Sequence, residues 1–254
     1  MPKIIAVAGK GGTGKTSICG MIVKYLAEKG EGQVLAVDAD PNSNLNEVLG
    51  VAAPTTLGEI REIVLKNTTG ENAPGGMSKQ EYMDFMFGDA LSEEKNFDLL
   101  VMGRTQGEGC YCFINGILRT QIVKYSKTYS HIIIDNEAGL EHISRGTLPK
   151  VDVLILISDC SRRGVQAAGR ASVLVDDLKL KPAIQKLIIN RAPDGVVPAT
   201  VLDEIKTQNL DLLGVISNDE TVYRYDSEGK PVVDVPDTSP IKIAIKSIIK
   251  DLNL

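Results

Sequence analysis

The glycine-rich stretch at residues 9–17 constrains the possible folds of this chain more than any other feature. It reads G-K-G-G-T-G-K-T-S and matches the phosphate-loop pattern G-x-x-x-x-G-K-[ST]. An apolar run at residues 4–8 precedes it, as a buried parallel strand would, and a helical pattern follows it. Strand, loop and helix in this order predict an α/β nucleotide-binding fold, in which backbone N–H groups and a helix start bind phosphates.

Each residue type of this loop has an expected task. Glycines allow a tight backbone path whose N–H groups point at phosphate oxygens. Lys15 can reach the terminal phosphates and the Thr16 hydroxyl can ligate Mg²⁺, so we expect ATP or ADP with Mg²⁺ as cofactors. The predicted nucleotide contacts from this loop are Gly9, Lys10, Gly11, Gly12, Thr13, Gly14, Lys15, Thr16 and Ser17.

Acidic residues follow two of the predicted strands. Asp38 and Asp40 come directly after the apolar run 34–37, and Asp135 ends a later run. The carboxyl ends of parallel strands are where an α/β sheet binds its ligand. We therefore expect Asp38 and Asp40 to hold Mg²⁺ through water molecules, and Asp40 to orient the attacking water as a catalytic residue. A polar turn capped by an aspartate is the alternative.

Short apolar runs predict a mostly parallel central sheet of about seven strands, flanked by helices. We find no internal repeat and expect a single P-loop NTPase domain over residues 1–254. Residues 50–96 are the least regular, and we expect them to form an insertion on the face that carries the nucleotide. The predicted strands cover residues 4–8, 34–37, 97–102, 131–135, 151–157, 184–189 and 212–216.

Composition narrows the function classes. The net charge of -5 argues against a general nucleic-acid-binding surface. No apolar run reaches the length of about 18 residues that a membrane span needs, and no signal peptide precedes the first strand. We therefore expect a cytoplasmic protein whose four cysteines are not a disulfide framework. Residues 240–254 form an amphipathic pattern that we expect to pack on the sheet rather than bind a membrane.

Two of the cysteines form the motif Cys110-x-Cys112, which precedes a predicted helix at residues 113–125. Thiolates are good ligands for Ni²⁺ and Zn²⁺. One chain offers only two sulfur atoms, whereas two chains facing each other across a two-fold axis offer four, enough for a closed metal site. The motif therefore predicts a metal shared between subunits, with two unrelated loop cysteines as the alternative.

The two lysines of the loop suggest a known family. The form G-K-G-G-x-G-K-[ST], with Lys10 as the first lysine, resembles the deviant phosphate loop of the MinD/ParA/nitrogenase iron-protein family of dimeric ATPases. In that family the first lysine reaches the partner's nucleotide, which implies a homodimer in which Lys10 and Lys15 are catalytic. The resemblance also implies ATP hydrolysis coupled to conformational change, with Asp40 in switch I at residues 38–45. Some relatives carry a further aspartate where this chain has Asn44.

Later segments extend this resemblance. Residues 135–139 have the D-x-x-[AG]-G form of switch II, in which Asp135 would accept from a Mg²⁺-bound water and the Gly139 amide would sense the γ-phosphate. Asn190 ends a predicted strand, and its amide carries the donor and the acceptor that an adenine edge needs. The resemblance places the base beside Asn190 and Arg191.

The cysteine motif narrows the family further. G-x-x-C-Y-C and, later, D-x-x-A-G-x-E-H-x-x-R-G-T resemble the CooC/AcsF group, ATPases for nickel-dependent maturation of carbon monoxide dehydrogenase or acetyl-CoA synthase. The resemblance implies that Cys110 and Cys112 hold Ni²⁺, or Zn²⁺, between subunits of a nucleotide- or metal-dependent homodimer. It also implies delivery of nickel to a client enzyme. Glu141 and His142 belong to the same motif, with a structural or signalling role for His142.

Two other functions stay open at this stage. An electron-transfer ATPase like the iron protein would share an Fe–S cluster, but that relative has a ligand cysteine shortly after switch II, and residues 135–146 contain none. A positioning ATPase of the MinD/ParA type would act on a membrane or DNA. The acidic net charge opposes that function, and it would leave the cysteine motif unexplained.

Overall fold

The computed structural model describes residues 2–52, 54–68, 74–104, 110–137, 150–178, 180–252 and 254. Strands and helices alternate along the chain, as in other α/β folds. The strands are β1 (Lys3–Gly9), β2 (Val34–Ala39), β3 (Leu91–Glu93), β4 (Phe97–Val101), β5 (His131–Asn136), β6 (Val153–Asp159), β7 (Ile184–Ala192) and β8 (Leu212–Ser217). The helices are α1 (Lys15–Lys29), α2 (Leu45–Leu49), α3 (Leu57–Asn67), α4 (Lys79–Gly88), α5 (Cys110–Tyr125), α7 (Arg162–Asp177), α8 (Ala199–Thr207), α9 (Glu220–Ser227) and α10 (Pro240–Asp251), with 3₁₀ turns η1 (Pro74–Gly76), η2 (Pro193–Gly195) and η3 (Val232–Asp234).

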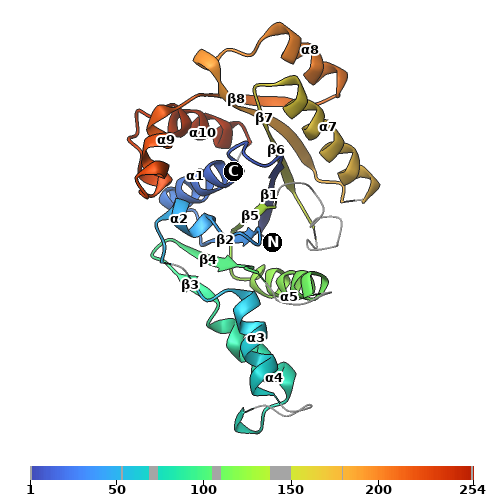
Figure 1. Cartoon of the computed structure of the whole chain (residues 1–254), viewed down its shortest axis with the longest axis vertical. Helices are drawn as coiled ribbons and strands as arrows, with labels where there is room; N and C mark the ends of the chain where they lie inside the picture. Colours follow the sequence, from blue (N-terminus) through green and yellow to red (C-terminus); the bar gives the residue numbers. More distant parts are fainter. Residues whose placement is uncertain are drawn as a thin grey trace.

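One eight-stranded sheet runs through the molecule in the order β3-β4-β2-β5-β1-β6-β7-β8 (Figure 1). Seven of these strands are parallel to their neighbours, and β3 runs antiparallel to β4 at the edge. The predicted α/β fold with a mostly parallel sheet is therefore confirmed. The sequence analysis missed β3, because two of its three residues are partly buried, the third is exposed, and together they form no apolar pattern. Strand β6 begins at Val153 rather than at the predicted Val151.

Apolar side chains cover both faces of the sheet. Ile5 and Val7 of β1 belong to the core that packs on α1, α2 and α10. Ile4, Ala6 and Ala8 of the same strand belong to the core that packs on α5, α7 and α8. Because successive side chains of a strand point to opposite faces, burial on both faces requires the unbroken apolar runs of the sequence. Because the seven parallel strands run in the same direction, their carboxyl ends lie at the same edge of the sheet.

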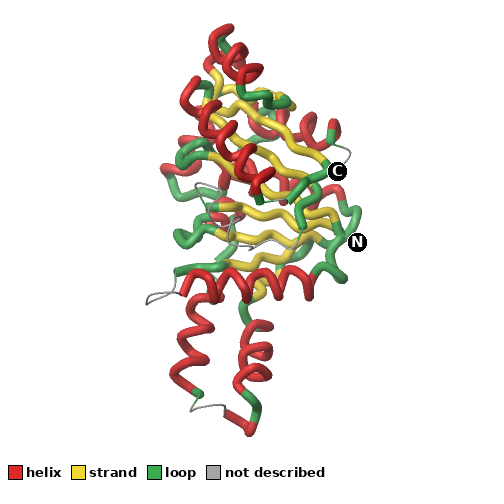
Figure 2. The backbone as a smooth tube through the Cα atoms, turned by 90° about the vertical axis from the view of Figure 1, so that its right-hand side faces the viewer, coloured by secondary structure: helices red, strands yellow, loops and turns green. Residues whose placement is uncertain are grey.

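The insertion at residues 50–96 lies elsewhere than expected. Helices α3 and α4 form a hairpin that projects beyond the β3–β4 edge, rather than covering the carboxyl ends of the strands (Figures 1 and 2). Helix α3 begins with a capping box in which the Thr56 hydroxyl accepts from the Glu59 N–H. Helix α4 begins in the same way with Ser78 and Glu81. These local signals determine where the helices start, whereas their direction depends on packing against each other.

Helix α10 confirms the expected packing of the last helix. Its buried face carries Ile241, Ile245 and Ile249 within the core that also contains α1 and β8 residues. On its other side, Lys242 and Lys246 lie 3.4 and 3.9 Å from the Asp237 carboxylate. Its charge is therefore partly compensated within the chain. Of the helices described, none has the length and apolar character to cross a bilayer.

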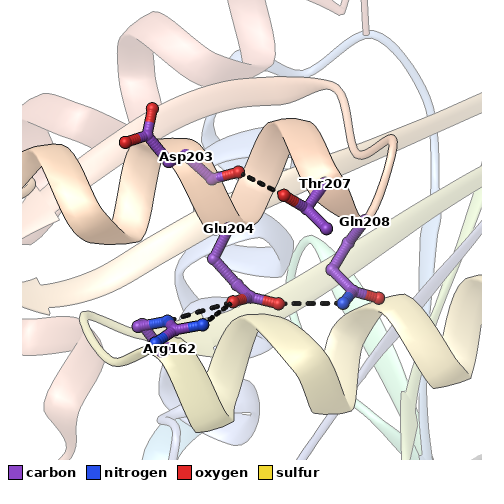
Figure 3. A network of polar contacts seen from close by, with 5 residues as sticks. All are labelled: Arg162, Asp203, Glu204, Thr207 and Gln208. Atoms are coloured by element: carbon purple, nitrogen blue, oxygen red, sulfur yellow. Dashed lines mark hydrogen bonds and ion pairs between the residues drawn. The ribbon is translucent and has the colours of Figure 1, made fainter.

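Helices α7 and α8 are joined by a polar network beside this sheet (Figure 3). The Arg162 guanidinium donates to Glu204 Oε2 through Nε at 3.0 Å and through Nη2 at 2.8 Å. The Gln208 amide donates to the other Glu204 oxygen at 2.9 Å. Because Glu204 is only 5% exposed, this pairing offsets the cost of burying its charge. The network fixes the start of α7 directly after the carboxyl end of β6.

Two helical glycines offer a matched stability test. An added Cβ at Gly20 of α1 would lie 2.4 Å from Val48 Cγ1, whereas one at Gly116 of α5 would meet nothing within 4 Å. We expect Gly20→Ala to lower the free energy of unfolding by about 1–3 kcal/mol through overpacking. We expect Gly116→Ala to raise it by roughly 0.5–1 kcal/mol, because alanine costs less backbone entropy in a helix. Urea unfolding of both variants measures this, and equal shifts would contradict the packing described.

Candidate functional site

The phosphate loop joins β1 to α1 at the carboxyl edge of the sheet. Gly12 and Gly14 take the left-handed backbone angles φ 79° and 86° that let the loop turn back on itself. The Thr13 hydroxyl closes the loop by donating to the Lys10 carbonyl at 2.8 Å. The Ile18 N–H then donates to the Gly14 carbonyl at 3.0 Å and starts helix α1. The predicted strand, loop and helix are therefore present in the predicted order.

The two lysines of the loop have different surroundings. Lys15 is 7% exposed, and its Nζ donates to the Lys10 carbonyl at 3.3 Å. Burial lowers the pKa of Lys15, while the carboxylates of Asp135 and Asp40 act in the opposite direction. The Lys10 side chain is exposed. Lys15 is thus held inside the site, and Lys10 is free to reach a group outside its own chain.

Asp38 anchors the turn that follows β2. Its side chain is completely buried and accepts from the Asp40 N–H at 3.0 Å and from the Leu45 N–H at 2.9 Å. Burial raises the pKa of Asp38 to about 6, although these hydrogen bonds act against the shift. Asp40 is partly exposed and accepts from the Asn42 N–H at 2.8 Å. Asp38 therefore holds the turn of the predicted switch I segment, and Asp40 is the more accessible carboxylate.

Asp135 lies opposite Asp38 in the register of β5 and β2. Its side chain is 1% exposed, and burial, followed by the Asp38 charge, raises the pKa of Asp135 to about 7. A hydrogen bond with the Thr16 side chain acts in the opposite direction. Among the described residues, Asp135 Oδ1 has no hydrogen-bond partner. A hydroxyl, a buried carboxylate and an unsatisfied acceptor fit Mg²⁺, which takes oxygen ligands and keeps several waters.

A pocket of about 730 Å³ opens beside the loop, between the ends of β7 and β8 and helix α9. Asn190 lines it, but its amide is already engaged. Nδ2 donates to the Thr13 carbonyl at 2.8 Å, and Oδ1 accepts from the Arg191 N–H at 2.9 Å. Asn190 thus ties β7 to the phosphate loop, and only its second N–H and second lone pair are left for a base. Adenine contact by Asn190 and Arg191 stays a prediction.

Several predicted residues fall outside the described structure. Gly139, Glu141 and His142 lie outside the described residues. Cys110 and Cys112 belong to the first turn of α5, so the helix begins three residues before the predicted start at 113. Their side chains are outside the description. The cysteine motif is therefore placed on a helix start rather than in a loop.

The sequence analysis also missed a contact between β5 and β1. Asn136 is 1% exposed, and its Nδ2 donates to the Val7 carbonyl at 2.9 Å. This bond ties the residue after Asp135 to the strand that leads into the phosphate loop. Its position directly after the strand-end aspartate is the only sequence signal for such a role. The start of the predicted switch II segment is therefore tied to the strand that precedes the phosphate loop.

Comparison with known proteins identifies the family of this chain. Residues 4–232 match the family model of the CobQ/CobB/MinD/ParA nucleotide binding domain. The chain belongs to this family. It is therefore an ATPase, and binding of a nucleotide with Mg²⁺ is expected of it.

Two relatives match this chain over about nine-tenths or more of their length. The chain is 38% identical to an uncharacterised ATP-binding protein of Methanocaldococcus jannaschii, covering 98% of each. It is 32% identical to the carbon monoxide dehydrogenase accessory protein CooC of Rhodospirillum rubrum, covering 91% of this chain and 89% of that protein. The structure of MinD from Pyrococcus horikoshii OT3, complexed with Mg-ADP, aligns at a TM-score of 0.74 over 100% of this chain and 96% of that one. At 23% identity, this last likeness concerns the fold alone.

The paired aspartates predict a pH dependence for the nucleotide-free, Mg²⁺-free protein. The raised pKa of Asp135 exceeds that of an unfolded chain, near 3.9, so the folded state retains a proton between about pH 4 and 7. Stability should therefore fall as the pH rises through this window. Asp135→Asn removes this penalty. The stability of the variant relative to wild type should therefore be roughly 2–4 kcal/mol greater at pH 8 than at pH 4.5. Urea titrations at both pH values measure this, and a pH-independent difference would contradict it.

Proposed function

We propose that the protein is an ATP-dependent metallochaperone, which holds nickel between two subunits and delivers it to carbon monoxide dehydrogenase or acetyl-CoA synthase in the cytoplasm. The observation that carries the proposal is the Cys110-x-Cys112 motif at the start of α5, in a chain 32% identical to CooC. Thiolates bind Ni²⁺ and Zn²⁺ well, and two chains supply the four sulfur atoms of a closed site. Among the described side chains, no group of three or more His, Cys, Asp or Glu residues is placed to hold a metal ion.

The described contacts support a division of tasks within the nucleotide site. The loop residues 9–17 would surround the phosphates, with buried Lys15 against the terminal ones and Thr16 and Asp135 near the cation. Mg²⁺ held near Thr16 and Asp135 would offset the negative charge of the phosphates. Asp40, as the accessible carboxylate of switch I, would orient the attacking water. The Gly139 amide would report the γ-phosphate, and exposed Lys10 would complete the partner's site.

This arrangement gives ATP a mechanical role. Closure of a dimer on two nucleotides would bring the four cysteines of two α5 helix starts together. Hydrolysis would release Lys10 from the partner's phosphates, reopen the dimer and expose the metal to the client. The partly compensated charge of α10 and the acidic net charge do not favour the membrane or DNA surface that a positioning ATPase needs.

The metal site is tested by removing the thiols. We expect Cys110→Ser with Cys112→Ser to abolish tight Ni²⁺ or Zn²⁺ binding, because a hydroxyl is a poor substitute for a thiolate with these metals. Cys160→Ser is the matched control, since Cys160 is a partly buried free cysteine in another part of the chain. Anaerobic equilibrium dialysis gives the metal stoichiometry of each variant. An unchanged stoichiometry in the double variant would remove the metallochaperone function.

Substitution of Lys15 and substitution of Lys10 should impair different steps. Lys15→Ala should lower ATP hydrolysis by on the order of a hundredfold or more, because it removes a preorganised charge at the phosphates. Lys10→Ala should leave Mg-ADP affinity of the single subunit near that of wild type, but abolish ATP-dependent dimerisation. Turnover assays, ADP titration and size-exclusion chromatography with ATP separate the two effects. Normal ATP-dependent dimers of Lys10→Ala would show that Lys10 does not act on a partner.

A further inference from the structure

Strand β4 ends against switch I, and the chain beyond it leads to the cysteine-bearing helix. The Met102 N–H donates to the Asp38 carbonyl at 2.8 Å, and the Met102 carbonyl accepts from the Gly58 N–H at 2.9 Å. Gly103 then turns the chain at φ 68°, where an added Cβ would lie 2.4 Å from Thr56 Cβ. The chain is therefore held on both sides as far as residue 103.

Arg104 is the next residue and contacts switch I directly. Its Nη2 donates to Asn42 Oδ1 at 2.5 Å. The Asn42 N–H in turn donates to Asp40 Oδ1 at 2.8 Å. These two hydrogen bonds connect the accessible carboxylate of the nucleotide site to a residue six positions before Cys110. Both Asn42 and Arg104 are exposed, so packing does not hold either side chain in this arrangement.

We propose that the Asn42–Arg104 hydrogen bond couples the nucleotide state of switch I to the start of α5, so that metal affinity depends on the bound nucleotide. This inference rests on the proposed function. When a change at the phosphates moves Asp40, the turn carrying Asn42 moves with it, because the Asn42 N–H is bonded to that carboxylate. Arg104 then follows or loses its acceptor. Arg104 is a positioning residue, since it acts on the metal segment without contacting nucleotide.

The strength of this contact sets the size of the expected effect. An exposed hydrogen bond to a charged group contributes modestly to stability, so it can form and break during a reaction cycle. A single such bond supports a change in affinity of about five- to tenfold between nucleotide states. Two subunits that share one metal would combine two such contacts.

The test measures Ni²⁺ affinity with and without Mg²⁺ and a non-hydrolysable ATP analogue. We expect the Ni²⁺ Kd of wild type to differ between the nucleotide-free and nucleotide-bound protein. Arg104→Ala should bind each ligand alone normally, but its nucleotide-dependent change in Ni²⁺ Kd should be about five- to tenfold smaller. Arg104→Lys keeps an N–H donor and should retain part of the shift. Asn42→Ala should also lose it, and combining Asn42→Ala with Arg104→Ala should add nothing further. Arg170→Ala, an exposed arginine on α7, is the matched control.

The outcomes separate this inference from the function on which it rests. A full shift in Arg104→Ala overturns the coupling alone. A wild type whose Ni²⁺ affinity does not change with nucleotide overturns the coupling and also the nucleotide-driven closure of the proposed function. Loss of Ni²⁺ binding by nucleotide-free Arg104→Ala also overturns it, because Arg104 would then shape the metal site itself. A wild type that binds no Ni²⁺ overturns the proposed function, and the coupling with it.

Discussion

Two aspartates buried in register at the carboxyl edge of the sheet govern the chemistry of this site. Asp38 and Asp135 lie opposite each other on β2 and β5, both almost completely shielded from water. Burial raises the pKa of both carboxyl groups, and the Asp38 charge raises that of Asp135 further. The buried ammonium of Lys15 compensates only part of the cost of burying these charges. Buried carboxylates therefore outnumber buried cations in this site, which favours binding of a further cation. A nucleotide complexed with Mg²⁺ supplies that cation.

The same pair also determines the local backbone. Because Asp38 accepts from two backbone N–H groups, the turn that carries Asp40 depends on its carboxylate. Asn136, directly after Asp135, holds the end of β1. The two switch segments and the phosphate loop thus share a rigid base, while Asp40 and Lys10 stay accessible. This combination of fixed and accessible groups suits an enzyme whose chemistry depends on movement of loops.

Much of this arrangement could be predicted from the sequence. Unbroken apolar runs identified seven parallel strands, because burial on both faces leaves no polar alternation. The hairpin of α3 and α4 was only partly predictable. Its capping boxes are local signals, but its projection beyond the sheet edge depends on tertiary packing. The contacts of Asn190 show the same limit, since its bond to Thr13 joins residues 177 positions apart in the chain.

The functional residues divide in the same way. The phosphate loop is a contiguous motif, and Cys110-x-Cys112 is visible from spacing alone. Arg104 carries no motif, and its acceptor lies 62 positions earlier, so only the fold reveals the contact. The carbonyl and amide groups at the end of β4 matter because they bring these distant segments together.

The three-residue strand β3 has a consequence for how copies of this chain can associate. An open parallel sheet presents unpaired N–H and C=O groups at its margin, which invite another chain to add by strand pairing. Here the edge is formed by the short antiparallel strand β3, which offers few backbone groups for pairing, and the hairpin of α3 and α4 projects beyond it. Assembly at this side by continuation of the sheet is therefore disfavoured, so any second copy of the chain has to bind through another surface.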